Sequence, residues 1–335
     1  MTPARSTATT RRRCLGLVAA VSAAALAPVS WHPAMASTPA VPVTSWQGVA
    51  LGADAQLRIV HPDRAWAGQL VQRAVAEVRR LERVFSLYRD DSALVRLNRD
   101  GILHDAPADL ARLLATTLQF SALTEGAFDP TVQPLWVLYA DAIRAGRPLP
   151  RGQALRAALA RVDWRAVRLE GRAIRLARPG MQLTLNGIAQ GYITDRVADL
   201  LRDAGLEHVL VDMGEVRAFA PPDAAPWRVG LAGDDEARTP LAALALREGA
   251  VSTSAGAGTV LDARSGLNHI FDPRTGLSPT QWRSVSVQAP SATTADALST
   301  AFCLMEVPAV RRVAAREGAQ VWALAHGASG LQKLV

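Results

Sequence analysis

Hydrophobic and polar positions alternate in patterns that predict helices and strands along the chain from residue 55. Apolar residues recur at helical spacing over 64–84 and fall on one face: Leu70, Val71, Val75, Val78, Leu81 and Val84. Residues 55–60 alternate as in a half-buried strand. The same spacing predicts further helices over 107–123, 152–161, 188–204, 293–305 and 308–317.

Strands are expected in groups between these helices. The predicted segments are 166–170, 173–177, 181–185, 209–213, 216–220, 227–231, 240–247, 284–288 and 319–325. Grouped strands favour an α+β architecture over a doubly wound sheet. Residues 220–226 and 254–268 are expected to be loops, and neither is long enough to separate domains.

The first 36 residues have the pattern of a cleavable export signal. Three arginines at 11–13 precede an Ala-rich apolar run, and Ala34-Met35-Ala36 is a small-x-small cleavage site. The run is shorter than the roughly 20 residues that span a bilayer. Adjacent arginines favour the twin-arginine route over the general secretory route. We expect an exported, periplasmic protein that begins with a Pro-containing lead-in over 37–48; association with the inner membrane stays open.

Removal of that segment changes the charge of the chain. The full sequence has a net charge of +7, and four of its arginines lie in residues 1–36, so the mature chain has +3. Without a dense basic stripe, a nucleic-acid partner is not expected. Of the two cysteines, Cys14 leaves with the signal. Cys303 lies in an apolar stretch and is expected to be buried and unreactive.

Two glycine-containing segments are candidates for ligand contact. Thr124-Glu-Gly-Ala-Phe-Asp-Pro-Thr131 brackets an aromatic residue and an acid, although judged alone it is better explained by a helix end followed by an Asp-Pro turn. Residues 184–195 open a helix after Gly187, where free N–H groups suit a phosphate. This segment matches neither the Walker loop nor the dinucleotide fingerprint, and an ordinary strand-turn-helix stays open.

Two further segments carry polar side chains of the kinds that act in catalysis. In residues 268–276, His269 is a candidate general base and Arg274 a candidate anion contact. In the helix over 293–305, Asp296 and Thr300 are i and i+4, so their oxygens share a face and suit Mg²⁺. An acid in the first turn of a helix also interacts favourably with the helix dipole, and taken alone this segment leaves that alternative equally open. The segment 252–258 lacks a following Lys and is expected to be a flexible turn.

Taken in order, the four segments resemble the ApbE family of FAD:protein FMN transferases over about residues 48–325. Ser86–Ser92 with Leu97-Asn98, and Val211–Glu215, also match. Each motif alone is weak, but the ordered set is specific. The resemblance implies a transferase domain over 49–335 with an α+β fold of two lobes, mixed or antiparallel sheets and flanking helices. FAD would bind in a cleft between the lobes.

The resemblance also implies a reaction and a set of site residues. FMN would pass from FAD to a Thr or Ser hydroxyl of a membrane-bound or exported redox protein, and AMP would leave. Mg²⁺ would be held by Asp296, Thr300 and a main-chain oxygen of Gly187. His269 would take the acceptor proton, with Asp129 or Asp272 as candidates to orient it. Flavin contacts are implied at Leu51, Tyr88, Ala127, Phe128, Asp129, Thr184, Gln190 and Ile270.

Two departures from the family pattern accompany this resemblance. Many members have Lys where this chain has Gln190, and the aromatic residue common after Ser254 is absent. Two alternatives to protein flavinylation stay open. Water could be the acceptor, which would make the protein an FAD pyrophosphatase, or the protein could bind flavin without catalysis.

Overall fold

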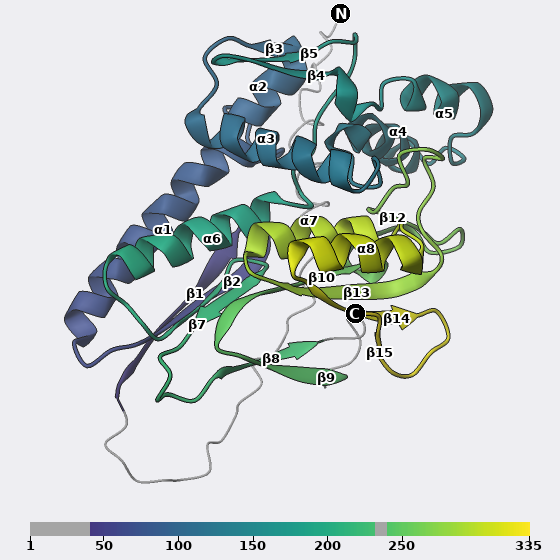
Figure 1. The fold of residues 1–335 in the computed structure, drawn as a ribbon. Helices are drawn as coiled ribbons and strands as arrows, with labels where there is room; N and C mark the ends of the chain where they lie inside the picture. The colour runs from purple at the N-terminus through teal and green to yellow at the C-terminus, as the bar shows by residue number, and fades with distance from the viewer. Residues whose placement is uncertain (1–40, 232–239) are drawn as a thin grey trace, which may run out of the picture.

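The computed structural model describes residues 41–231 and 240–335, and an eight-stranded antiparallel sheet is its centre (Figure 1). The strands hydrogen-bond in the order β1-β2-β6-β7-β10-β13-β14-β15. Their bounds are β1 Val43–Ala50, β2 Ala53–Val60, β6 Val209–Asp212, β7 Val216–Phe219, β10 Glu248–Ala255, β13 Trp282–Ala289, β14 Gln320–Ala325 and β15 Gln332–Lys333. Antiparallel pairing of grouped strands confirms the predicted α+β architecture.

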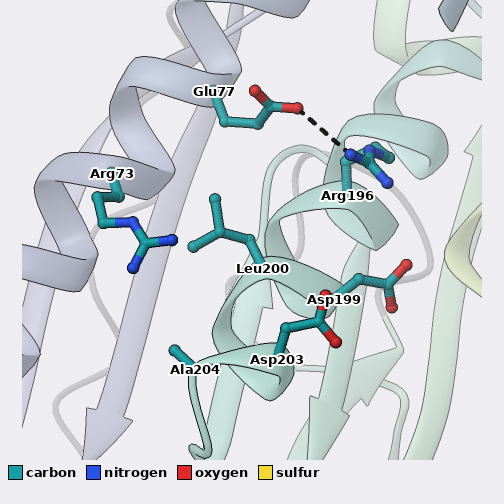
Figure 2. Close-up of a pocket in the computed structure, with 7 residues that line it drawn as sticks. All are labelled: Arg73, Glu77, Arg196, Asp199, Leu200, Asp203 and Ala204. Carbon is teal, nitrogen blue, oxygen red and sulfur yellow. Dashed lines mark ion pairs between the residues drawn. The ribbon is translucent and has the colours of Figure 1, made fainter.

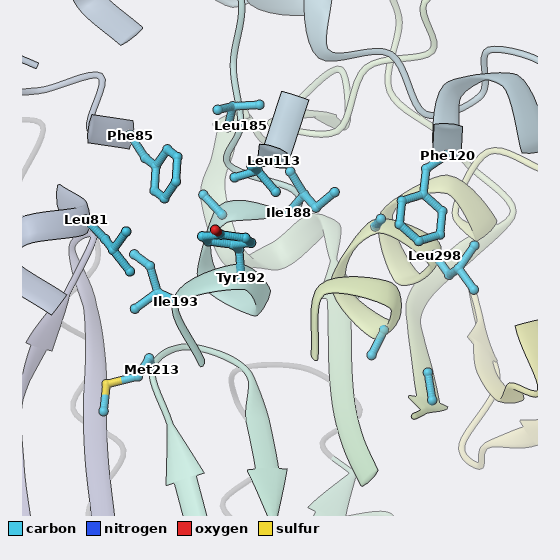
Figure 3. Packing of buried hydrophobic residues seen from close by; sticks show 14 of the residues in the cluster. Leu81, Phe85, Leu113, Phe120, Leu185, Ile188, Tyr192, Ile193, Met213 and Leu298 are labelled. Atoms are coloured by element: carbon cyan, nitrogen blue, oxygen red, sulfur yellow. The ribbon is translucent and has the colours of Figure 1, made fainter. Parts of the chain in front are cut away.

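Helices cover one face of this sheet (Figure 1). They are α1 (Arg64–Phe85), α6 (Ala189–Asp203), α7 (Ala292–Phe302) and α8 (Val307–Glu317). The apolar stripe of α1 is buried as its spacing predicts, and α3 (Ala108–Leu123) adds side chains above α6. In Figure 3, Leu81, Tyr192 and Leu298 lie among the packed side chains of this core, which fixes α6 and α7 between the sheet and α3.

A smaller group of elements lies beyond these helices, on the side away from the large sheet (Figure 1). It contains α2 (Ala93–Asp100) and a sheet of order β3-β5-β4 (Ile102–Leu103, Ala173–Leu176 and Val167–Glu170). It also contains α4 (Gln133–Arg144), α5 (Gly152–Leu159) and the short helices η1 (Pro130–Val132) and η2 (Trp164–Ala166). A separate apolar cluster joins α4 and α5 to the loop after β12 (Leu267–Asn268).

The other face of the large sheet is covered by a hairpin. Its strands are β8 (Trp227–Leu231) and β9 (Ala242–Leu246), which bury Val229, Leu231 and Leu246 against Leu210 and Val251 of the sheet. Between β10 and β13 the chain forms η3 (Gly256–Thr259), β11 (Val260–Asp262) and β12. The predicted loop over 254–268 therefore contains a short hairpin.

Most predicted helices and strands are confirmed, with instructive exceptions. Residues 43–48 of the predicted lead-in belong to β1, an edge strand whose exposed positions include Val43 and Val49, so alternation is hard to read. The predicted turn over 252–258 is wrong, because Ser252–Ala255 end the central strand β10. Helices α2 and α4 were not predicted from the sequence.

The predicted strand over 181–185 is also wrong, for a reason visible in its hydrogen bonds. Its apolar residues alternate inward, with Met181, Leu183 and Leu185 buried. The backbone of Leu183, however, bonds to a side chain instead of a strand: its N–H donates to Asn98 Oδ1 at 2.7 Å, and Asn98 Nδ2 donates to its carbonyl at 2.8 Å. An amide side chain thus replaces a neighbouring strand.

The sequence also predicted an export signal and a buried cysteine. The predicted signal over 1–36 lies outside the described residues. Across 41–231 and 240–335, no helix has both the length and the apolar character needed to cross a bilayer. Cys303 is buried as expected, and burial raises the pKa of its thiol to about 12.

Candidate active site

The helices α6 and α7 touch at a glycine, and this contact places a carboxylate at the start of α6. Gly191 N–H donates to Asp296 Oδ2 at 2.9 Å. A Cβ on Gly191 would lie 2.3 Å from the carbonyl oxygen of Ala292 and 2.8 Å from Asp296 Cβ. Only glycine permits this close approach. Gly191, in the predicted segment 184–195, is therefore required for α6 to pack against the α7 helix that carries Asp296.

A second close contact lies one turn along α7. A Cβ on Gly187 would lie 2.9 Å from Thr300 Oγ1 and 3.2 Å from Phe128 Cε2. Thr300 Oγ1 is also 3.2 Å from Ser254 Oγ, on the strand that the sequence did not predict. The structure therefore brings together three of the four candidate segments, around Phe128, Gly187 and the Asp296–Thr300 pair.

Asp296 is a buried acid with little to balance its charge. Its side chain belongs to a residue that is 3% exposed, and no Arg, Lys or His of the described chain pairs with it. Burial raises the pKa of Asp296 to about 7; the Gly191 N–H opposes the shift, and the nearby charge of Asp195 adds to it. A carboxylate held in this way is stabilised by a bound cation.

Glu215 is a second buried acid beside Asp296, and it was not among the predicted site residues. It follows β6 in the Val211–Glu215 stretch that contributed to the family resemblance. Burial and the charge of Asp296 raise the pKa of Glu215 well above its usual value. Asp212, in the same stretch, has its pKa raised to about 6 by burial. Acids on β6 and α7 thus share one low-dielectric region.

These residues fit a hard divalent cation. The described ranges contain no group of three or more His, Cys, Asp or Glu side chains arranged to hold a metal. The predicted set needs only one carboxylate, because the hydroxyl of Thr300 and the carbonyl of Gly187 would supply the other oxygens. Mg²⁺ is bound in proteins by few carboxylates together with neutral oxygens and substrate phosphates. The uncompensated charge of Asp296 beside that hydroxyl fits this chemistry.

Asp195, on the next turn of α6, holds the N-terminus of α7 in place. Its carboxylate accepts hydrogen bonds from the N–H groups of Ala292 (2.9 Å) and Thr293 (2.8 Å) and from Thr293 Oγ1 (2.6 Å). Arg217 Nη1 donates to it at 2.8 Å. Asp195 lies within the second segment, but its role was not predicted, because sequence spacing does not reveal which helix end an acid will face.

The predicted flavin contacts in the first segment lie in a tightly closed loop. Asp129 accepts hydrogen bonds from Thr131 N–H (2.8 Å), Thr131 Oγ1 (2.6 Å) and Trp164 N–H (3.1 Å), and burial raises its pKa. These contacts engage its carboxylate in fixing the loop. Ala127 and Phe128 precede it, and Phe128 is directed toward Gly187.

The remaining predicted flavin contacts come from several elements. Thr184 Oγ1 accepts from Asn186 N–H at 3.2 Å. Gln190 lies against Gly214, where a Cβ would be 2.4 Å from Gln190 Nε2. Leu51 has φ +47° in the β1–β2 turn and donates its N–H to Glu82 Oε1 at 2.9 Å, and Tyr88 is 69% exposed. The contacts of Leu51 link it to α1, not to Asp296.

His269 and Ile270 lie on the loop after β12. His269 Nδ1 is 3.3 Å from the carbonyl oxygen of Thr259. A carbonyl can only accept, so this hydrogen bond places the proton on Nδ1 and the lone pair of the neutral ring on Nε2. Asp272, the proposed partner for orienting His269, has its carboxylate engaged by Arg274 at 2.9 Å.

Helix α4 supports this histidine loop from behind. The ring of Tyr139 stacks on Phe271 at a centroid distance of 5.6 Å. Tyr139 Oη donates to the carbonyl of Gly276 at 3.0 Å. A side chain on α4 therefore fixes both halves of the loop.

Two surface pockets lie outside this constellation. Figure 2 shows a pocket of about 320 Å³ between α1 and α6, where Arg196 and Glu77 pair across 3.9 Å. A second, of about 360 Å³, lies between residues 98–102 and 175–181. Neither is lined by Gly187, Asp296 or His269.

Sequence comparison places this geometry in a known family. A profile described as the ApbE family matches residues 51–324, which is most of the chain. The chain belongs to the ApbE family. All four candidate segments lie inside the ApbE match, including the contact between α6 and α7.

Individual ApbE relatives agree over long stretches. A protein of Treponema pallidum named FAD:protein FMN transferase is 36% identical over 247 residues, which are 66% of this chain and 67% of that protein. One of Klebsiella pneumoniae with the same name is 27% identical over 315 residues, 89% of each chain.

Two solved ApbE structures have the same fold. The apo form of the flavinyl transferase ApbE of Pseudomonas stutzeri superposes with a TM-score of 0.72 at 28% identity, covering 87% of this chain and 94% of that chain. The ApbE protein of Thermotoga maritima gives 0.75 at 25% identity, covering 87% and 97%.

Proposed function

We propose that this protein transfers the FMN part of FAD to an acceptor protein, as the names of its ApbE relatives state for those proteins. The observation that carries the proposal is the meeting of Asp296, Thr300 and Gly187 at the contact of α6 and α7. The transferase domain would cover residues 49–335.

We assign Mg²⁺ to this contact. The Asp296 carboxylate, the Thr300 hydroxyl and the Gly187 carbonyl would hold the ion beside the FAD pyrophosphate. When bound, Mg²⁺ offsets the charge that develops on the phosphates. Asp296 supplies a charge that burial leaves without another counterion, and the positive end of the α6 dipole, at its N-terminus, would favour the phosphates.

The acceptor would be a Thr or Ser hydroxyl of a membrane-bound or exported redox protein. We assign the removal of its proton to His269, since the contact of Nδ1 with Thr259 leaves the lone pair on Nε2. The hydroxyl oxygen would form a phosphoester with FMN, and AMP would leave with the other phosphate. Tyr139 fixes the loop that carries His269, which supports this assignment.

The flavin ring would be bound by the side chains predicted from the sequence. Phe128 lies against Gly187, and Ala127 and Asp129 belong to the same loop as Phe128. Thr184 Oγ1 accepts from Asn186 N–H, next to Gly187 in the chain. Leu51, Tyr88, Gln190 and Ile270 complete the proposed set. Gln190 would contribute a neutral hydrogen bond where many relatives have a Lys.

The proposed site of action is outside the cytoplasm. Residues 1–36 would direct export by the twin-arginine or the general secretory route, and the mature chain would begin at Ser37. Intact-mass measurement of the protein recovered from a periplasmic fraction tests this. A full-length mass in that fraction would contradict cleavage.

The central test uses purified protein, FAD and Mg²⁺ with candidate exported redox proteins, followed by intact-mass analysis of each acceptor. We expect the acceptor to gain the mass of FMN, and chelation of Mg²⁺ to stop the gain. Release of FMN and AMP at an equal or higher rate without an acceptor would indicate a pyrophosphatase instead. Tight FAD binding without turnover toward any acceptor would indicate a flavin carrier.

A further inference from the structure

Positive charge is concentrated in one segment of the chain. Residues 141–178 contain ten arginines and three acids, Asp141, Asp163 and Glu170, which give a net charge of +7. The mature chain carries +3, so the rest of it carries −4. The expectation that no dense basic stripe exists is therefore wrong. It failed because the whole-chain charge averages a basic segment with an acidic remainder.

All ten of these arginines are exposed. They lie on α4, α5, η2, β4 and β5 and the loops between them, at the end of the molecule that lies away from the large sheet (Figure 1). Four of them pair with acids: Arg144, Arg172, Arg175 and Arg178. Within the described ranges, the other six have no carboxylate within ion-pair distance. We call these ten side chains the arginine surface.

The sheet of order β3-β5-β4, which carries part of this surface, places like charges together. Arg168 on β4 is directly opposite Arg175 on β5. Like charges at opposed positions destabilise a sheet, so folding alone does not favour this pair. Between Arg168 and Glu170, Leu169 is 38% exposed and adds an apolar side chain to the charged surface.

An open pocket joins the arginine surface beside β5. Its lining includes Arg175 and Arg178 from the arginine surface and Arg99 from α2. Each of these guanidinium groups pairs with a carboxylate, Arg99 with Asp100, Arg175 with Glu170 and Arg178 with Asp163. A phosphate in this pocket of about 360 Å³ would therefore have to share or replace those partners.

We propose that the arginine surface binds the anionic headgroups of a lipid bilayer, so that the enzyme works at a membrane surface. Clusters of Lys or Arg next to a bilayer are attracted to its anionic lipids. The centre of a protein interface, in contrast, is depleted of charge and enriched in apolar anchors. In 141–178 the exposed large apolar side chains are Ile143 and Leu169, whereas ten arginines are exposed. This composition is typical of a surface for anionic lipids and not of the centre of a protein interface.

The test measures co-sedimentation with phosphatidylcholine vesicles that do or do not contain phosphatidylglycerol, at low and at high salt. The mature chain, which begins at Ser37, is compared with a variant that loses three unpaired arginines of the surface: Arg147→Gln, Arg156→Gln and Arg168→Gln. A matched control loses three exposed arginines on α1 and α8: Arg79→Gln, Arg312→Gln and Arg316→Gln. Both variants have the same net charge and the same N-terminus.

We expect the unchanged chain to bind only the anionic vesicles and to be released by salt. The arginine-surface variant should bind at least about tenfold more weakly, and the control within about twofold of the unchanged chain. Transfer of FMN to a soluble acceptor should be equal in all three, which separates this proposal from the function itself. Equal binding to neutral vesicles, or equal loss in the control, would overturn it.

Two competitors distinguish a bilayer from other sources of phosphate. Inorganic phosphate at the total lipid-phosphate concentration should leave the protein on the vesicles, because dispersed arginines match an extended charged surface. Release by inorganic phosphate would assign the pocket to a free anion. Release by an equal phosphate concentration of double-stranded DNA, with tighter binding to the DNA than to the vesicles, would assign the surface to nucleic acid.

Discussion

Asp195 on α6 and Asp296 on α7 are two buried acids at the same helix contact. Each accepts hydrogen bonds from the other helix, but their surroundings differ. Asp195, on α6, receives four hydrogen bonds: three from the first turn of α7 and one from Arg217. Asp296, on α7, receives one, from Gly191 in the first turn of α6. The first acid is satisfied by the protein, whereas the second is left with a charge that the fold does not balance.

This difference separates a carboxylate that supports the fold from one that we propose to be functional. A buried charge with several donors stabilises the element it contacts, here the N-terminus of α7. A buried charge with one donor destabilises the protein unless a ligand completes it. Folding therefore depends on Asp195 for the position of α7, and α7 in turn carries Asp296, the proposed ligand of Mg²⁺.

Replacement of Asp296 by Asn should have the largest effect on function. The amide can still accept from Gly191 but carries no charge, so we expect FMN transfer to fall by at least about 10³-fold, because a catalytic metal supplies several kcal/mol. The rate of mass gain of the acceptor measures this. The melting temperature in the absence of Mg²⁺ should stay the same or rise. If transfer survives, the metal assignment is wrong; if the fold collapses, Asp296 is structural.

Replacement of Asp195 by Ala should instead act on stability. It leaves two N–H groups of α7 without their partner and Arg217 with only Asp199, so the free energy of unfolding should fall by about 3–5 kcal/mol in denaturant titrations. Asp199→Ala is the matched control, because Asp199 pairs with the same Arg217 at 3.2 Å but is 46% exposed. The control should lose less than about 1 kcal/mol. Equal losses in the two variants would contradict the structural role of Asp195.

The two acids should also differ in how pH acts through them. The pKa of Asp296 is raised from its ordinary 3.8 to about 7, so the native protein keeps a proton that the unfolded chain has lost between these values. Without Mg²⁺, stability should therefore decrease as pH rises from about 4 to about 7, by about 3 kcal/mol. Denaturant titrations across this range measure the slope.

The Asp296→Asn variant is the control for that slope. It should flatten the curve but not abolish it, because burial also raises the pKa values of Glu215 and Asp212, which act in the same direction. Added Mg²⁺ should favour the ionised form and stabilise the protein at the upper end of the range. An unchanged slope in the variant would show that Asp296 does not hold the proton.

Sequence reasoning found Asp296 but not the environment that distinguishes it from Asp195. Helical spacing placed Asp296 beside Thr300, and two glycines marked a backbone contact, because those signals are local. Hydrogen bonds between residues about 100 positions apart, such as Asp195 with Ala292, have no local signal. The family resemblance added the order of the segments but not the number of donors around each acid.

The fold shows the same limit. Long amphipathic helices such as α1 follow from their spacing alone, whereas β10 was missed. Its residues Ser252, Thr253 and Ser254 are all polar, so they show no apolar alternation. Their hydroxyls form hydrogen bonds with Ser299 and Ser286. A strand whose inward side chains are polar and satisfied by tertiary contacts cannot be recognised from a hydrophobic pattern.

The smallest expected effects come from a threonine beside each acid. Thr300→Val removes the proposed ligand hydroxyl and should reduce FMN transfer by about tenfold, with unfolding free energy nearly unchanged, since one neutral ligand contributes far less than the charge of Asp296. Thr293→Val removes the hydroxyl that donates to Asp195 at 2.6 Å and should cost about 1.5 kcal/mol of stability while leaving transfer per folded molecule within about twofold. Paired rate and denaturation measurements on the two variants compare them directly.

Thr300→Ser should restore transfer, because the hydroxyl and not the methyl group is the proposed ligand. If Thr293→Val impairs transfer as much as Thr300→Val, the division between the structural and the functional acid fails.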